Sequence, residues 1–171
     1  MARVTVQAPN PLEWLVTPSL LCMAGSLLLA LPVKLFGFQA PEPVFAMVPA
    51  FAWAAIRPSM LPPLALVFVG LFQDVLWGGP LGLWPLSLLT LYGLAFSVRQ
   101  VLTGEGFWAL GAWYAAVCAI GFGAGLLLVT LVSGEAPSLA GVALQYGVTL
   151  PLFPLSWLII ERFEDADVRF R

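Results

Sequence analysis

Charge is scarce in this sequence. Only 9% of its 171 residues are charged, whereas 61% are hydrophobic. Soluble globular domains carry roughly 25% charged residues, and so few charges do not cover the surface of a soluble protein of this size. The main solvent of the chain is therefore expected to be lipid. The composition predicts an all-α integral membrane protein.

Other absences exclude whole classes of chemistry. The chain has no histidine, which removes the most versatile acid–base catalyst and the commonest metal ligand. Cys22 and Cys118 lie in apolar runs and are interpreted as small buried side chains, not as a zinc site or a disulfide. A net charge of −2 argues against a basic nucleic-acid-binding face. Phosphate-binding glycine-rich loops with lysine and metalloprotease motifs are also missing, so we expect neither an enzyme nor a cofactor.

Charged residues divide the apolar sequence into six segments. A helix needs about 20 apolar residues to cross about 30 Å of hydrocarbon. The second segment is short, because its residues reach only about 21 Å at about 1.5 Å each. The chain is thus predicted to be a bundle of six transmembrane helices, or of five if the second segment is re-entrant, and six is preferred. The predicted spans are 14–33, 43–56, 59–77, 81–98, 107–133 and 137–160, followed by a solvated tail, 161–171.

Lysine and arginine are expected in short cytoplasmic loops, which orients the chain. With six spans and a cytoplasmic N-terminus, only Lys34 lies outside. With five spans and an external N-terminus, only Arg3 lies outside, so the two counts are equally good. Both alternatives place the C-terminus in the cytoplasm. The basic residues that the six-span alternative places inside are Arg3, Arg57, Arg99, Arg162, Arg169 and Arg171.

Asp74 is the principal functional candidate. It lies within the apolar sequence GLFQDVLWGGPLG, residues 70–82. An ionisable group at membrane depth is costly and marks a functional site by default. The glycines allow close helix approach and a tight turn, and Pro80 stops the preceding helix from continuing. Three roles remain open for Asp74, namely pinning of a loop, docking of a partner, and coupling to an ion or substrate, and pinning is favoured.

Arg57 and Pro58 form a second candidate feature. Proline disfavours helix at the residue before it, so this pair marks a sharp turn between two apolar segments. We interpret Arg57 as a charge that fixes the topology, with a contact to a partner or to anionic lipid headgroups as the alternative.

Small residues recur at a spacing of four in two segments. They are Ala46, Ala50 and Ala54 in one, and Gly121 and Gly125 in the other. Such spacing forms faces on which helices pack closely. Packing within the monomer is expected, with docking of a single-span partner as the alternative.

Two stretches of this sequence resemble the bacterial rod shape-determining MreD family. One is AWAAIRP, residues 52–58, and the other is the 70–82 sequence, continued by LWPL. The likeness is best over 41–99 and extends more loosely, as hydropathy and length, over the whole chain. The residues that match the family's two most recognisable stretches are Arg57, Pro58, Asp74, Gly78, Gly79, Pro80, Leu81 and Gly82.

This resemblance implies a non-enzymatic scaffold in the bacterial inner membrane that helps organise peptidoglycan synthases and maintains cell shape. The implied main partner is MreC, a single-span protein with a periplasmic coiled coil. The actin-like MreB, the glycosyltransferase RodA and a class B penicillin-binding protein belong to the wider complex. The implied fold is similar to the six-helix substrate-binding subunit of energy-coupling-factor transporters. Homo-oligomerisation is left open.

The alternative function is a substrate-capturing membrane subunit of a vitamin or small-molecule importer. A capture site needs several polar groups that converge in an apolar pocket. Docking of the transporter's coupling subunit also needs an exposed small-residue face, which residues 46–54 are expected to offer. The candidate polar side chains are Gln73, Asp74, Ser87, Thr90, Thr130, Gln145 and Thr149.

Overall fold

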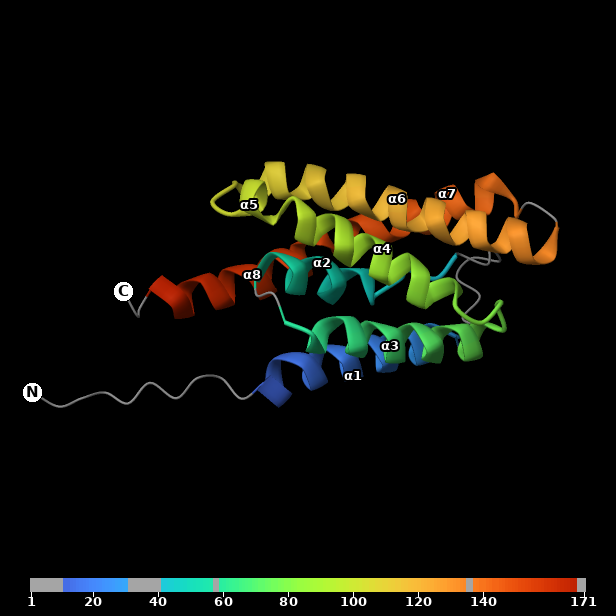
Figure 1. The fold of residues 1–171 in the computed structure, drawn as a ribbon, viewed down its shortest axis with the longest axis horizontal. Helices are drawn as coiled ribbons and strands as arrows, with labels where there is room; N and C mark the ends of the chain where they lie inside the picture. Colours follow the sequence, from blue (N-terminus) through green and yellow to red (C-terminus); the bar gives the residue numbers. More distant parts are fainter. Residues whose placement is uncertain (1–10, 31–40, 57–58, 135–136, 169–171) are drawn as a thin grey trace, which may run out of the picture.

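The computed structural model describes residues 11–30, 41–56, 59–134 and 137–168, and within them it contains helices and no strand. The predicted all-α class is confirmed for these residues. The helices lie roughly along one common axis, and α2 runs in the direction opposite to α1 and α3 (Figure 1). The elements are α1 Pro11–Ala30, α2 Met47–Ile56, α3 Leu61–Trp77, α4 Leu83–Ser97, α5 Arg99–Leu102, α6 Phe107–Ser133, α7 Leu139–Thr149, the 3₁₀ turn η1 Leu150–Leu152, and α8 Phe153–Val168.

Each predicted apolar segment contains a helix. The 137–160 segment contains two helices, because η1 separates α7 from α8. Helix α8 continues beyond residue 160 to Val168. By length and composition, two helical stretches are long and apolar enough to cross a membrane, namely Phe107–Ser133 and Leu139–Arg162. The first turn of α1 and the last turn of α8 lie at the same end of the bundle (Figure 1).

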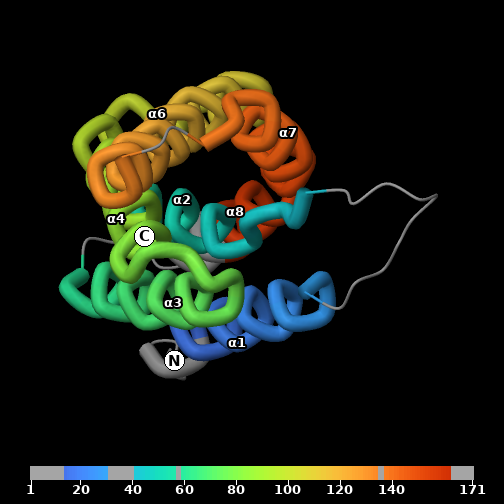
Figure 2. The backbone as a smooth tube through the Cα atoms, turned by 90° about the vertical axis from the view of Figure 1, so that its right-hand side faces the viewer, coloured from blue at the N-terminus to red at the C-terminus, as the bar shows by residue number. Residues whose placement is uncertain are grey.

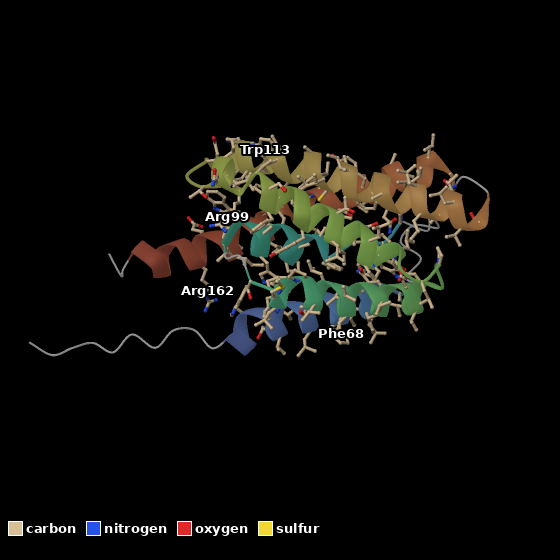
Figure 3. All side chains as sticks on the ribbon, viewed as in Figure 1. Phe68, Arg99, Trp113 and Arg162 are labelled. Atoms are coloured by element: carbon tan, nitrogen blue, oxygen red, sulfur yellow. The ribbon has the colours of Figure 1, made fainter. Side chains whose placement is uncertain are left out.

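Many large apolar side chains lie on the surface of the bundle. They are exposed along the outer helices, and Phe68 on the outer face of α3 is 73% exposed (Figure 3). Some polar side chains are buried, and a buried polar group needs a hydrogen-bond partner inside the fold. The buried polar side chains are Ser26, Gln73, Asp74, Ser87, Thr149 and Ser156. This arrangement suits an apolar solvent.

Helix α2 is the buried centre of the bundle. All its residues from Met47 to Ala54 are buried, as expected for a helix that is apolar on every side. Figure 2 shows α2 and α8 between the α1–α3 pair on one side and the α6–α7 pair on the other. Ala46, Ala50 and Ala54 are each fully buried, so this small-residue face packs within the monomer.

The segment that leads into α2 has no regular structure, although Val44 and Ala46 are fully buried. Buried backbone groups outside regular structure need other partners. Side chains from α1 and α7 supply partners to this segment. The bonds are Val44 N–H to Thr149 Oγ1 at 3.1 Å, Gln145 Nε2 to the Glu42 carbonyl at 3.3 Å, and Cys22 Sγ to the Phe45 carbonyl at 3.4 Å. Within α2 itself, the Val48 carbonyl accepts a bond from Ser156 Oγ of α8 at 3.3 Å.

Proline causes the break between α7 and α8. Pro151 has no N–H, so the regular hydrogen-bond ladder stops there. Across the break the Phe153 N–H bonds to the Leu150 carbonyl, which deprives the Thr149 carbonyl of its usual donor four residues on. The hydroxyl of the fully buried Tyr114, on α6, donates to that carbonyl at 3.4 Å. A side chain from a neighbouring helix thus replaces the lost backbone donor.

Replacing Tyr114 with phenylalanine is therefore expected to destabilise the protein by about 1 kcal/mol, or about 2–4 °C in Tm. The control is Tyr146→Phe. The Tyr146 hydroxyl donates to the Ala115 carbonyl at 3.1 Å, which lies in the regular part of α6 and keeps its helical donor. Thermal unfolding in detergent measures both, and equal losses would contradict a special role for Tyr114.

Candidate functional site

The turn between α3 and α4 is built on two glycines in left-handed backbone conformation. Gly78, directly after α3, has φ 67° and donates its N–H to the Asp74 carbonyl. Gly82, directly before α4, has φ 98°. Side chains other than glycine are strained at such φ values. The Gly79 N–H also bonds to the Asp74 carbonyl, at 3.2 Å, so this carbonyl holds the end of α3.

The carboxylate of Asp74 holds the other side of the same turn. Asp74 is only 1% exposed. Its Oδ2 accepts the Gly82 N–H at 2.6 Å, and its Oδ1 accepts the Trp84 N–H at 2.9 Å. Helix α4 has no side-chain cap from its own N-cap residue, so a residue of the preceding helix supplies it. A negative charge at a helix N-terminus is also favoured by the helix dipole.

Helix α4 packs closely against glycines of two neighbouring helices, α3 and α6. A Cβ on Gly70 of α3 would lie 2.5 Å from the Pro85 nitrogen, and one on Gly125 of α6 would lie 2.5 Å from Ser87 Oγ. A Cβ on Gly121 would lie 3.1 Å from the Ser87 carbonyl. Figure 2 shows α4 between α3 and α6. The expectation that Gly121 and Gly125 pack within the monomer is confirmed.

The predicted site residues do not all share one place. Asp74, Gly78, Gly79 and Gly82 meet through hydrogen bonds in the α3–α4 turn. Pro80 takes part through its carbonyl, which accepts the Leu83 N–H at 3.2 Å. Arg57 and Pro58 lie outside the described residues.

Aromatic neighbours of Asp74 were missed by the sequence analysis. Trp77 meets Trp84 edge to face, with ring centroids 4.9 Å apart, and Trp84 meets Phe122 at 6.2 Å. Trp84 is buried, although a tryptophan near the end of a predicted span is expected at the membrane interface. The position of Trp84 two residues after Gly82 is the one signal that it approaches the turn.

Two expectations for a capture subunit fail. The Ala46–Ala54 face is buried and is not available for a coupling subunit, because α2 lies at the centre of the bundle. Several of the candidate polar groups are also occupied by internal bonds. Asp74 accepts two N–H groups at the N-terminus of α4, and Gln145 donates to the Glu42 carbonyl. Thr149 accepts from the Val44 N–H and donates to the Gln145 carbonyl, and Thr130 donates to the Leu126 carbonyl.

Basic residues lie at the end of the bundle away from Asp74. Arg99, at the start of α5, and Arg162, on α8, both lie at the end where α1 begins (Figure 3). The Arg99 guanidinium lies over the Phe96 ring, 5.8 Å from its centroid. Among the described residues no group of three or more acidic, cysteine or histidine side chains is placed to hold a metal ion.

Comparison with protein-family models, with curated proteins and with solved structures found no match to this chain. The family resemblance therefore depends on the quoted residues, and the structure adds what those residues do locally. Most of them form one hydrogen-bonded turn that joins α3 to α4.

Proposed function

We propose that this protein is a multi-pass membrane scaffold of the bacterial rod-shape complex, related to the MreD family. It binds MreC and thereby helps to organise RodA, a class B penicillin-binding protein and MreB at the inner membrane. The observation that carries the proposal is the α3–α4 turn, in which the buried Asp74 bonds to the N–H groups of Gly78, Gly79, Gly82 and Trp84. The stretch that resembles the family thus joins α3 to α4.

The use of polar side chains supports a scaffold over an importer subunit. Backbone groups inside the bundle are the hydrogen-bond partners of the Gln145, Thr149 and Asp74 side chains. A capture site needs polar groups that are free to meet a ligand. The outer surface is apolar, which suits contact with lipid and with the span of a partner. Such docking is driven by close packing and a few polar contacts.

The arrangement of the helices favours six spans with both ends in the cytoplasm. Because α2 runs opposite to α1 and α3, it acts as a crossing and not as a hairpin that returns to its own side (Figure 1). The bundle end that carries Arg99 and Arg162 also carries the first turn of α1 and the last turn of α8. Under the positive-inside rule that end faces the cytoplasm. The proposed fold is the six-helix one of energy-coupling-factor substrate-binding subunits.

Depletion of the protein in its own rod-shaped host is expected to turn the cells into spheres. A tagged copy purified in mild detergent is expected to bring MreC with it, and a plasmid-borne wild-type copy to restore the rods. The matched control is Glu105→Ala, which alters an exposed residue in the loop between α5 and α6 and is expected to restore rods as well. Cells that stay rod-shaped on depletion, with no MreC recovered, would refute the proposal.

A further inference from the structure

Two buried polar atoms on one face of α3 have no hydrogen-bond partner among the described residues. They are Oε1 of Gln73, a residue that is fully buried, and the indole Nε1 of Trp77. The other amide atom of Gln73, Nε2, donates to Ser26 Oγ on α1 at the long distance of 3.5 Å. Ser26 is itself only 1% exposed. A buried acceptor, Gln73 Oε1, therefore lies beside the contact between α1 and α3, and a buried donor, the Trp77 N–H, lies four residues further along α3.

The two atoms suit a single shared ligand. Residues four apart on a helix lie on one face with their Cβ atoms about 5–6 Å apart, and both side chains here are long enough to converge on one small molecule. Unpaired polar groups are costly in an apolar interior and are usually satisfied by protein or by bound water. We propose that one water molecule binds between α1 and α3, accepting from the Trp77 indole N–H and donating to Gln73 Oε1.

Water also fits if the Gln73 amide is turned over. Oε1 then faces Ser26, and Nε2 becomes the free group beside Trp77. Two N–H donors then need an acceptor, and water offers two lone pairs as well as two donors. The proposed ligand is neutral, because Asp74, the one charged residue of α3, has its two oxygens engaged by the Gly82 and Trp84 N–H groups.

This water connects the packing of α1 to the α3–α4 turn. Gln73 bonds to Ser26 on α1, and Trp77 packs edge to face on Trp84. The Trp84 N–H in turn bonds to Asp74, the residue after Gln73. The inference does not depend on the proposed function, because it concerns only how the purified chain holds α1.

A double-mutant cycle on the full chain in detergent tests the shared ligand. The variants are Gln73→Leu, Trp77→Phe and the pair together, each followed by thermal unfolding. A shared water predicts that each single change lowers Tm by about 3 °C or more, since it leaves the other group unsatisfied, and that the double change costs clearly less than the sum. Additive effects, or a rise in Tm for Gln73→Leu, would overturn the proposal.

Two further measurements complete the test. Trp108→Phe, at an indole that is 86% exposed, is the control for loss of a tryptophan N–H and is expected to leave Tm unchanged. A high-resolution density map of the purified protein is expected to show a peak about 3 Å from both Gln73 and Trp77. A map with the two side chains ordered and no peak between them would overturn the proposal independently of the Tm values.

Discussion

Replacing Gly70 with alanine is expected to prevent the protein from folding stably. The new Cβ would lie 2.5 Å from the Pro85 nitrogen and 2.8 Å from both its Cα and Cδ. These atoms belong to the backbone and to a rigid ring, so they do not move aside as a flexible side chain does. Relief requires α4 to move away from α3, which pulls the Trp84 N–H off Asp74. We expect a loss of about 3 kcal/mol or more, measured as Tm and as the yield of monodisperse protein.

Other glycines in the chain provide graded controls. Gly123→Ala, on α6, meets no atom within 4 Å and is expected to leave the yield and Tm unchanged or slightly higher. Gly125→Ala meets the Ser87 hydroxyl, which belongs to a side chain, so its cost is expected to be intermediate. If Gly70→Ala behaves like Gly123→Ala, α3 and α4 do not pack as closely as the structure has them.

Apolar run length predicted where helices lie but not where they break. The 107–133 segment coincides with α6, because glycines cap it on both sides and no proline falls within it. The 137–160 segment is also apolar, and hydropathy does not register that Pro151 lacks an N–H. Whether a proline kinks or breaks a helix depends on which neighbour supplies the missing donor. Here that neighbour is Tyr114 on α6, whose approach is a tertiary contact.

The spacing of small residues predicted close packing but not its partner. Ala46, Ala50 and Ala54 do pack closely, as four-residue spacing indicates. Spacing alone does not distinguish a helix of the same chain from a helix of another protein. The difference lies in the position of α2 at the centre of the bundle, which follows from contacts with α3, α4 and α8. The alanine face, which from spacing alone could also have bound a partner, thus packs inside the fold.

Asp74 was found from the sequence because a lone acid in an apolar stretch is conspicuous. Its hydrogen-bond partners were not found from the sequence. They are the backbone N–H groups of Gly82 and Trp84, and every residue other than proline carries such a donor. The glycines on either side indicated a tight turn, and Gly78 and Gly82 do adopt φ values that favour glycine. Gly79 has no positive φ, so backbone conformation does not explain why this position is a glycine.

Replacing Asp74 with alanine is expected to lower the stability of the protein by about 3 kcal/mol, because two N–H groups at the N-terminus of α4 lose their acceptors in a buried site. Asp74→Asn keeps one acceptor oxygen but turns an NH₂ group toward the second N–H. It is therefore expected to recover at most part of the loss. Thermal unfolding in detergent gives the order, with the wild type first, Asn next and Ala last.

The control for this series is Glu105→Ala, since Glu105 is an exposed acid in the loop between α5 and α6. Its removal is expected to change neither Tm nor cell shape. Combining Tm with complementation of a depleted rod-shaped host separates the roles considered for Asp74. A lower Tm with a proportionate loss of protein and of rods indicates that Asp74 pins the turn. Spherical cells with a normal Tm and a normal protein level indicate a direct contact between Asp74 and a partner. An Asp74→Ala variant that keeps Tm, protein level and rod shape would show that the carboxylate has neither role.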